Sequence, residues 1–311
     1  MAVTSALAEG RSHALPAFIG RASRLGATIA VTIFGLLVVT FLIGRVVPVD
    51  PVLAVVGDRA SQSTYDKAFI ELGLDRPLYV QFGLYVKKAV TGDFGESLLT
   101  KKPIIDDIAR AFPATLELAT VAILIGTLLG IPVGVWAAVR QGKLVDQVVR
   151  IVGLMGYSAP IFWLGLLGLL VFYAKWGIVA GPGRIDISYE YAFTPTTGLF
   201  LLDTAMQGQW GAFRNVVSHI ALPASLLAYY SMAYIARMTR SFMLNELAQE
   251  YVVTARVKGV AEWRIIWVHA LRNAAVPLVT VITLSYASLL EGSVLTETVF
   301  AWPGIGRLMF E

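Results

Sequence analysis

Two carboxylates stand beside long uncharged runs, where they could carry protons. Glu117 directly precedes the uncharged run 118–139, and Glu291 interrupts the end of the apolar stretch that begins at Asn273. Burying a carboxylate at the depth of a bilayer costs about 2.5 kcal/mol or more, so each group must face water or other helices. For Glu117 we favour a structural partner or a place at the membrane interface. For Glu291 a proton-carrying role and a structural role both stay open.

The other residue types exclude most further chemistry. The 311 residues contain no cysteine and only three scattered histidines, so neither a disulfide nor a cysteine or histidine metal cluster is expected. His219, in an apolar run, is expected to be a hydrogen-bonded packing residue. No G-x-x-x-x-G-K-[ST], H-E-x-x-H or G-x-S-x-G motif occurs, so the chain has neither the usual phosphate-binding loop nor a hydrolase signature. Energy for active work must come from another polypeptide or from an ion gradient.

A charged stretch at 238–277 lies between two apolar runs and is built to work outside a membrane. Its part 250–259 ends on basic residues and then glycine, which is typical of a helix C-terminus: cations oppose the dipole, and glycine can adopt a positive φ. Apolar and small residues then recur at the spacing of one helical face: Trp263, Ile266, Trp267, Ala270 and Ala274. We expect a short docking helix, followed by a helix along the membrane surface with its indoles at headgroup level.

The composition places these features in a polytopic membrane protein. The chain is 57% hydrophobic and 15% charged, with a mean hydropathy of +0.69, which is far too apolar for a soluble domain of this length. The net charge of +4 is explained by basic loops on one side of a membrane. No basic stripe is interleaved with exposed aromatic residues, so nucleic acid is not an expected partner.

The chain divides into segments by the placement of uncharged runs. About 20 apolar residues cross a hydrocarbon core, which sets the length of each expected span. We expect a cytoplasmic tail at 1–24, a first span at 25–47 and a periplasmic segment at 48–111, within which 79–90 forms an amphipathic helix. The domain 112–311 then holds spans at 115–139, 151–174, 215–236 and 274–298, a loop at 237–273 and a periplasmic end at 299–311.

Loop charges predict the orientation of these five spans. The short loop before the third span carries Arg140, Lys143 and Arg150 against Asp146, and residues 237–272 carry six Lys or Arg against three Glu. Short basic loops stay on the cytoplasmic side, so both loops are expected inside. The N-terminus is then cytoplasmic and Glu311 lies outside.

Prolines and glycines interrupt the expected spans. Pro132, Pro160, Pro223 and Pro277 each remove a backbone donor, which neighbours or water must replace in lipid. A packing kink is the simpler interpretation, and hinges beside a transport path are the functional one. The two overlapping G-x-x-x-G patterns at 126–134 are expected to serve helix packing.

Several motifs in order give the chain a resemblance to a known family. The run YVVTARVKG at 251–259, with HALRN at 269–273 and then Pro277, resembles the cytoplasmic "EAA" loop of bacterial ABC-importer permeases of the dipeptide and oligopeptide group. Similar runs are LGLDRP at 72–77, GDFG at 92–95, TLEL at 115–118, GYSAP at 156–160, RMTR at 237–240 and TETVFAWPG at 296–304. The chain departs from the pattern in having VTA at 253–255 in place of Glu-Ala-Ala. Family members carry a further span, so we expect a sixth helix after Glu311; the alternative is that five spans suffice.

The resemblance implies an all-α transmembrane bundle of the type I ABC importer permease kind, in the bacterial inner membrane. Its implied partners are a homologous second permease, two ATPases that bind ATP and Mg, a periplasmic solute-binding protein and membrane lipid. The chain itself would hold no cofactor or metal and would not be an enzyme. The implied solutes are dipeptides and short peptides, with nickel, haem precursors or glutathione as alternatives.

Function is assigned to three groups of residues. The ATPase-docking helix is expected to use Glu250, Tyr251, Thr254, Ala255, Arg256, Lys258 and Gly259. A second cytoplasmic contact would use Arg140, Lys143 and Asp146. The candidate pathway or gate residues are Pro160, Pro223, Glu291 and Glu297.

Two other classes of function compete with the ABC permease. A proton-coupled secondary carrier would use Glu117 or Glu291, and a scaffold or assembly factor would use the charged loop only to hold a partner. Copurifying ATPases favour the permease, and autonomous gradient-driven uptake favours the carrier. Partners without transport favour the scaffold.

Overall fold

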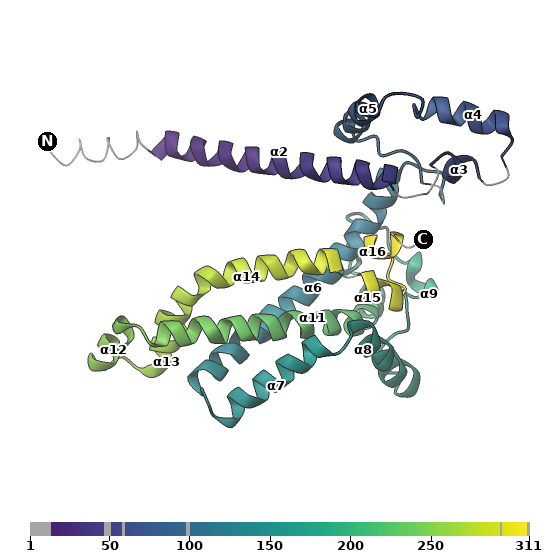
Figure 1. The fold of residues 1–311 in the computed structure, drawn as a ribbon. Helices are drawn as coiled ribbons and strands as arrows, with labels where there is room; N and C mark the ends of the chain where they lie inside the picture. Colours follow the sequence, from purple (N-terminus) through teal and green to yellow (C-terminus); the bar gives the residue numbers. More distant parts are fainter. Residues whose placement is uncertain (1–13, 47–50, 58–59, 98–99, 293, 310–311) are drawn as a thin grey trace. The chain divides into compact units, whose positions relative to one another are not determined.

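The computed structural model describes residues 14–46, 51–57, 60–97, 100–292 and 294–309, and these are helical apart from connecting turns (Figure 1). The only β pairing among these residues is an isolated bridge between Glu96 and Pro103. The chain forms two compact units, Met1–Ile105 and Asp106–Glu311. The expected all-α class is confirmed.

The first unit contains one long apolar helix and three short ones. Their bounds are α2 Ala14–Val46, α3 Pro51–Val56, α4 Gln62–Glu71 and α5 Leu78–Thr91. Phe34 and Phe41 of α2 contact the ring of Phe82 on α5 edge-on, with centroids 5.9 and 5.3 Å apart. The expected first span lies within α2, which begins earlier, at Ala14; residues 1–13 of the expected tail lie outside the described residues. Helix α5 matches the helix expected at 79–90.

The second unit is a bundle of long helices with short helices at both ends. The long elements are α6 Ile104–Val139, which begins in the first unit, α7 Leu144–Ser158, α8 Ile161–Gly168 with the π-helical turn η1 Leu169–Lys175, α11 Trp210–Leu247 and α14 Leu271–Gly292. The short elements are α9 Ile187–Glu190, α10 Phe200–Met206, α12 Glu250–Val257, α13 Glu262–Arg264, the π-helical turn η2 Ile265–Ala270, α15 Val294–Val299 and α16 Ile305–Leu308. Helix α11 packs against α7, α8, α10 and α14.

Glycines bring α6 and α11 into direct backbone contact. A Cβ added at Gly130 would lie 3.1 Å from the carbonyl oxygen of Met232, and one at Gly134 would lie 2.5 Å from that of Ala236. All three glycines of the G-x-x-x-G runs, including Gly126, are buried. Small residues permit this close approach, so the expected packing role is confirmed.

The third span differs from the continuous helix expected at 151–174. Helix α7 ends at Ser158, and the chain resumes as α8 and η1 at an angle of 95°. Pro160 causes the break, because it lacks an N–H and disfavours helical backbone at the preceding residue. Ala159 accordingly has extended backbone, with φ −86° and ψ 130°.

The stretch after Gly259 also differs from the expected surface helix. Helix α13, η2 and α14 continue as one helix over Glu262–Glu291. Trp263 and Trp267 are exposed, whereas Ala270 and Ala274, expected on the same face, are buried. The π-helical turn η2 explains the split, because i→i+5 bonding shifts the phase of every later side chain.

Four described helices are long and apolar enough to cross a membrane, and the bent pair of α7 with α8–η1 makes up to five. The fourth span lies in α11, which continues past the expected end at 236 to Leu247. The fifth comprises α14 and then α15, with residue 293 between them outside the described residues. Helix α6 starts at Ile104, before the expected end of the periplasmic segment at 111.

Substitution of Gly134 tests the contact between α6 and α11. Gly134→Ala places a Cβ against the Ala236 carbonyl, and we expect a loss of about 1–3 kcal/mol in stability from overpacking. Gly35→Ala in α2 is the control, because an added Cβ there meets no heavy atom within 4 Å. Thermal unfolding of the two detergent-purified variants measures the difference, and equal stability contradicts the assigned contact.

Candidate functional site

Helix α12 is a short projection that ends in a tight glycine turn. The N–H of Gly259 donates to the Arg256 carbonyl at 3.0 Å, and that of Val260 donates to the Ala255 carbonyl at 3.1 Å. This pair of bonds is the Schellman pattern, which requires a left-handed residue after the helix. Gly259 has φ 73°, which confirms the predicted positive φ.

Two contacts hold α12 against the bundle. Val252 is fully buried, and α12 packs on η2. The Tyr251 hydroxyl donates to the Glu246 carboxylate at 2.7 Å, at the end of α11. Burial raises the pKa of Tyr251 above its usual value, so the hydroxyl keeps the proton it donates. Helix α12 is therefore connected to α11 through Tyr251 and to the segment before α14 through its packing on η2.

The opposite face of α12 is open and partly apolar. Val253 and Val257 are 54% and 83% exposed, and Thr254 and Lys258 are exposed beside them. The two valines were not among the predicted contact residues, although their i, i+4 spacing places them on one face of the predicted helix. An exposed apolar strip with a flanking cation is a surface suited to contact with another protein.

The remaining predicted residues of α12 differ in how exposed they are to a partner protein. Glu250 is exposed and Ala255 is half-buried. The Arg256 guanidinium forms an ion pair with Glu262 at 2.8 Å, although the sequence analysis had assigned it to acidic groups of a partner. Both groups of the pair are substantially exposed, so it contributes little to stability.

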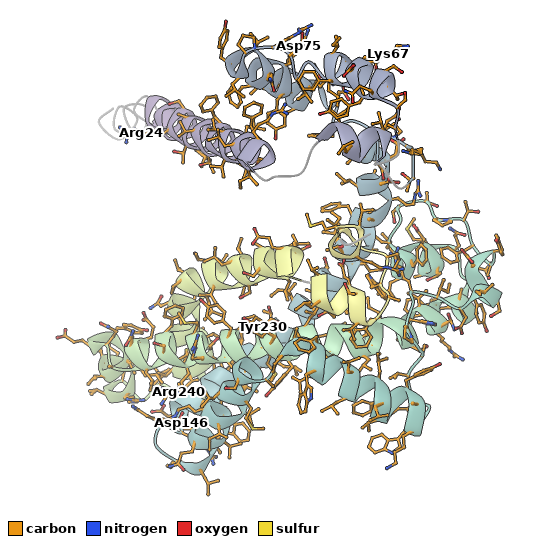
Figure 2. All side chains as sticks on the ribbon, turned by 45° about the vertical axis from the view of Figure 1, so that its right-hand side comes forward. Arg24, Lys67, Asp75, Asp146, Tyr230 and Arg240 are labelled. Atoms are coloured by element: carbon orange, nitrogen blue, oxygen red, sulfur yellow. The ribbon has the colours of Figure 1, made fainter. Side chains whose placement is uncertain are left out.

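The loop between α6 and α7 lies at the same end of the unit as α12 (Figure 1). Arg140 and Lys143 are exposed there, but Asp146 is 1% exposed. Its carboxylate accepts from Arg240 Nε at 2.5 Å and Nη2 at 2.8 Å, and Figure 2 shows the two residues together. Asp146 was predicted to be part of the second cytoplasmic contact, and this prediction is corrected. The buried Asp146 side chain instead joins the start of α7 to α11.

The opposite end of the unit holds Glu297 in a closed network. Glu297 is fully buried, and its carboxylate accepts from the Thr115 hydroxyl at 2.6 Å and the Arg307 N–H at 3.1 Å. The buried Trp302 indole donates to the Ala114 carbonyl at 2.9 Å. Glu291, by contrast, is exposed at the end of α14. The two predicted gate carboxylates thus occupy different environments.

Glu117 lies in a second buried network at that end. Arg184 donates to Glu117 Oε2 through Nε at 3.1 Å and Nη2 at 2.5 Å, and stacks on Phe200 with 3.8 Å to the ring centroid. Burial lowers the pKa of Arg184, and the Glu117 charge opposes that change. Glu117 therefore has a structural partner, as favoured. His219 is buried with Nδ1 2.9 Å from the Asn215 carbonyl oxygen, which agrees with a packing role.

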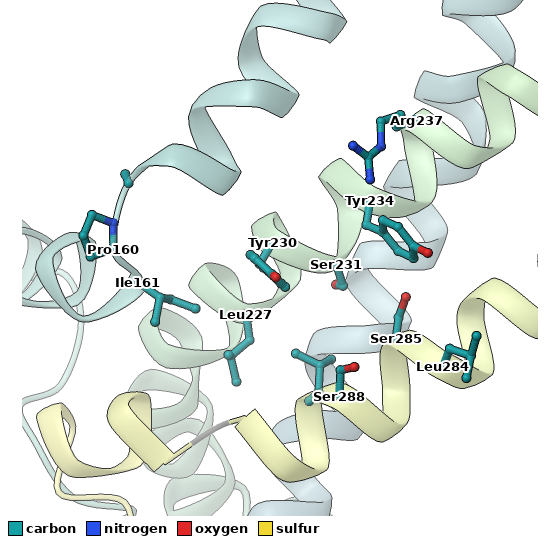
Figure 3. Close-up of a pocket in the computed structure, with 12 residues that line it drawn as sticks. Pro160, Ile161, Leu227, Tyr230, Ser231, Tyr234, Arg237, Leu284, Ser285 and Ser288 are labelled. Carbon is teal, nitrogen blue, oxygen red and sulfur yellow. The ribbon is translucent and has the colours of Figure 1, made fainter.

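A cavity of about 540 Å³ opens where α7 breaks from α8, and Figure 3 shows it between α11 and α14. Pro160 lines it, so this predicted residue stands at both the helix break and the cavity wall. Pro223 is buried within α11 and is not among the lining residues. The cavity also has a cation and several hydroxyl groups, from Arg237, Tyr230, Tyr234, Ser231, Ser285 and Ser288.

Several helices long and apolar enough to cross a membrane, a short projecting helix and a polar cavity between long helices are features expected of a membrane transport component. Residues 130–311 match the family described as binding-protein-dependent transport system inner membrane component, and residues 18–119 match its N-terminal counterpart. The chain belongs to this family and is a multi-pass inner-membrane permease subunit. This assignment confirms the predicted ABC permease class over the two competing hypotheses, an autonomous carrier and a scaffold.

The relatives agree over nearly the whole chain. The chain is 43% identical over 280 residues to the probable D,D-dipeptide transport system permease protein DdpB of Escherichia coli K12, covering 89% of this chain and 82% of that protein. It is 44% identical over 295 residues to the di/tripeptide transport system permease protein DppB of Pseudomonas aeruginosa, covering 94% and 86%. A chain of the inward-facing MetNI methionine ABC transporter gives a TM-score of 0.47 at 19% identity, covering 67% of this chain and 80% of that one.

The Asp146–Arg240 pair is tested by a double-mutant cycle. Asp146→Asn leaves a mostly buried guanidinium without its anion, and Arg240→Gln leaves a buried carboxylate, so each is expected to cost about 1–3 kcal/mol. Asp146→Asn combined with Arg240→Gln should cost clearly less than the sum, as contacting residues do. Thermal unfolding of the purified subunit measures all three. Strictly additive losses would show that the pair is not a coupled contact.

Proposed function

We propose that this subunit moves dipeptides and short peptides across the bacterial inner membrane in an ATP-driven importer. The observation that carries the solute class is the 41–44% identity, over about nine-tenths of the chain, to permeases whose names specify dipeptide or di/tripeptide transport. The resemblance also implied nickel, haem precursors or glutathione as alternative solutes, whereas the relatives reported above are named for dipeptide or di/tripeptide transport.

ATP hydrolysis is assigned to separate subunits that dock at the α12 end. The open face of α12, with Val253, Val257 and Lys258, offers one contact, and Arg140 and Lys143 offer another. Two ATPases, which bind ATP and Mg, would then press on α12 and on the α6–α7 loop. Because α12 contacts both α11 and η2, displacement at this surface reaches both long helices.

The remaining partners follow from the orientation. The basic loops support a cytoplasmic location for the α12 end, so in this proposal the opposite end, with α9 and α16, faces the periplasm and meets the solute-binding protein. A homologous second permease completes the path, and lipid covers the outer helix faces. Glu291, exposed at the periplasmic end, stays our candidate for the outer gate, whereas Glu297 stabilises the structure behind it.

The docking surface is tested with Ala255→Trp. The larger side chain blocks close approach to α12, so we expect loss of copurifying ATPase and of peptide uptake, while membrane insertion is retained. Ala89→Trp is the matched control, because Ala89 is also a half-buried alanine two residues before the last residue of a helix. Pull-down and uptake of labelled dipeptide by proteoliposomes containing the full complex are the measurements.

The outcomes of that experiment separate its two parts. Normal ATPase binding and uptake in Ala255→Trp would falsify the docking assignment. Failure of the unmodified complex to import any dipeptide, with ATP and binding protein present, would instead overturn the solute class.

Orientation is tested by single cysteines, which are unambiguous because the chain contains none. Ser188 in α9 and Gln249 before α12 are both exposed. Ser188→Cys is expected to react with an impermeant thiol reagent in intact spheroplasts, and Gln249→Cys only after the membrane is opened. The reverse labelling would invert the proposed topology.

A further inference from the structure

The cavity between α11 and α14 has the size of a small-molecule site. Its volume of about 540 Å³ falls within the range of about 300–1,000 Å³ common for ligand pockets. The break between α7 and α8 creates it: Ala159 and Pro160 form part of the wall where a continuous helix would have filled the space. Ile161, Leu227 and Leu289 add apolar surface.

Polar groups enter the cavity from two helices. Tyr230, Tyr234 and Arg237 share one face of α11 at i, i+4 and i+7. The Arg237 guanidinium lies over the Tyr234 ring, 5.4 Å from its centroid. Ser285 and Ser288 come from α14 on the facing side (Figure 3). These groups give the cavity a polar wall, which suits a polar solute better than a lipid chain or an apolar side chain.

Two buried serine hydroxyls in the cavity wall can still accept hydrogen bonds. Ser231 is 2% exposed and Ser285 9% exposed. Ser231 Oγ donates to the Ala228 carbonyl at 3.1 Å, and Ser285 Oγ donates to the Val281 carbonyl at 2.8 Å. Each oxygen still has lone pairs that can accept from an N–H donor. The walls therefore suit a solute that carries its own amide N–H groups.

The charges of the cavity are separated. Arg237 supplies a cation from α11, and Ala159 caps the C-terminus of α7, where helix carbonyls carry partial negative charge. A small zwitterion with a carboxylate at one end and an ammonium group at the other matches this arrangement. Guanidinium binds carboxylate strongly because both the charges and the donor geometry match.

We propose that this cavity is a transit site for the solute, in which Arg237 binds the carboxylate of a short peptide and the tyrosine and serine hydroxyls bind its polar backbone. The ammonium end lies toward the Ala159–Pro160 break. This inference rests on the proposed peptide function. It adds a recognition step inside the membrane subunit, after delivery of the peptide to the bundle.

Cysteine protection tests the site. In the purified complex of permeases and ATPases, Ser288→Cys is labelled by a thiol reagent with and without excess Ala-Ala added directly. We expect bound Ala-Ala to slow labelling, and the Ala-Ala amide, which lacks the carboxylate, to protect about tenfold less well or worse. Val279→Cys, on the same helix and 62% exposed outside the cavity, is the labelling control because its rate is expected to stay constant.

The role of Arg237 is tested in the same assay. Arg237→Gln combined with Ser288→Cys should lose protection by Ala-Ala, whereas Arg150→Gln, an exposed arginine outside this cavity, should keep it. Equal protection by peptide and amide would overturn the carboxylate contact. Labelling unaffected by Ala-Ala, in a complex that imports Ala-Ala with its binding protein, would overturn the transit site while leaving the proposed function intact. Absence of all peptide import would overturn both.

Discussion

The close contact between α6 and α11 is the constraint on which the second unit depends. Backbone carbonyls of α11 lie so near Gly130 and Gly134 that no side chain fits between the two helices. A buried apolar cluster surrounds this contact and draws on all three helices, with Leu118 from α6, Leu227 from α11 and Leu278 from α14. In lipid, helices gain little from hydrophobic burial against each other, so contacts that require small residues decide which faces meet. The cavity and α12 both lie along α11, so their positions depend on that choice of faces.

Two departures from regular helix lie beside the elements that matter for the proposed function. Pro160 ends α7 and turns the chain by 95°, which opens space between spans. The π-helical turn η2 lies where the external segment becomes a span, and it brings Ile265 and Ala270 into the core beneath α12. Wider turns are found at functional sites, because they cost stability and persist only where they position a side chain. Both departures stand beside the elements to which we assign transport.

Features governed by nearby residues could be predicted from the sequence, and those governed by distant ones could not. The helix before Gly259 follows from a local C-terminal pattern. Asp146 seemed available because its loop is short and charged, but its partner Arg240 is 94 residues away. Four prolines were candidates for a kink or a hinge, and Pro160 could not be distinguished from the others. The sequence does not show whether the carbonyl group left without a donor by each proline finds another partner. The phase shift at η2 depends on hydrogen-bond register, which side-chain spacing does not encode.

The two contacts of α12 decide which helices can separate. Tyr251 joins it to the end of α11, and its packing on η2 joins it to the segment before α14. Helices α11 and α14 are thus clasped at one end by α12, and they share the buried cluster along their length. The fastening limits how far α11 and α14 can part at that end of the cavity. The third wall is less constrained, because Pro160 has no N–H and α7 and α8 therefore meet at a break in the helical hydrogen bonding.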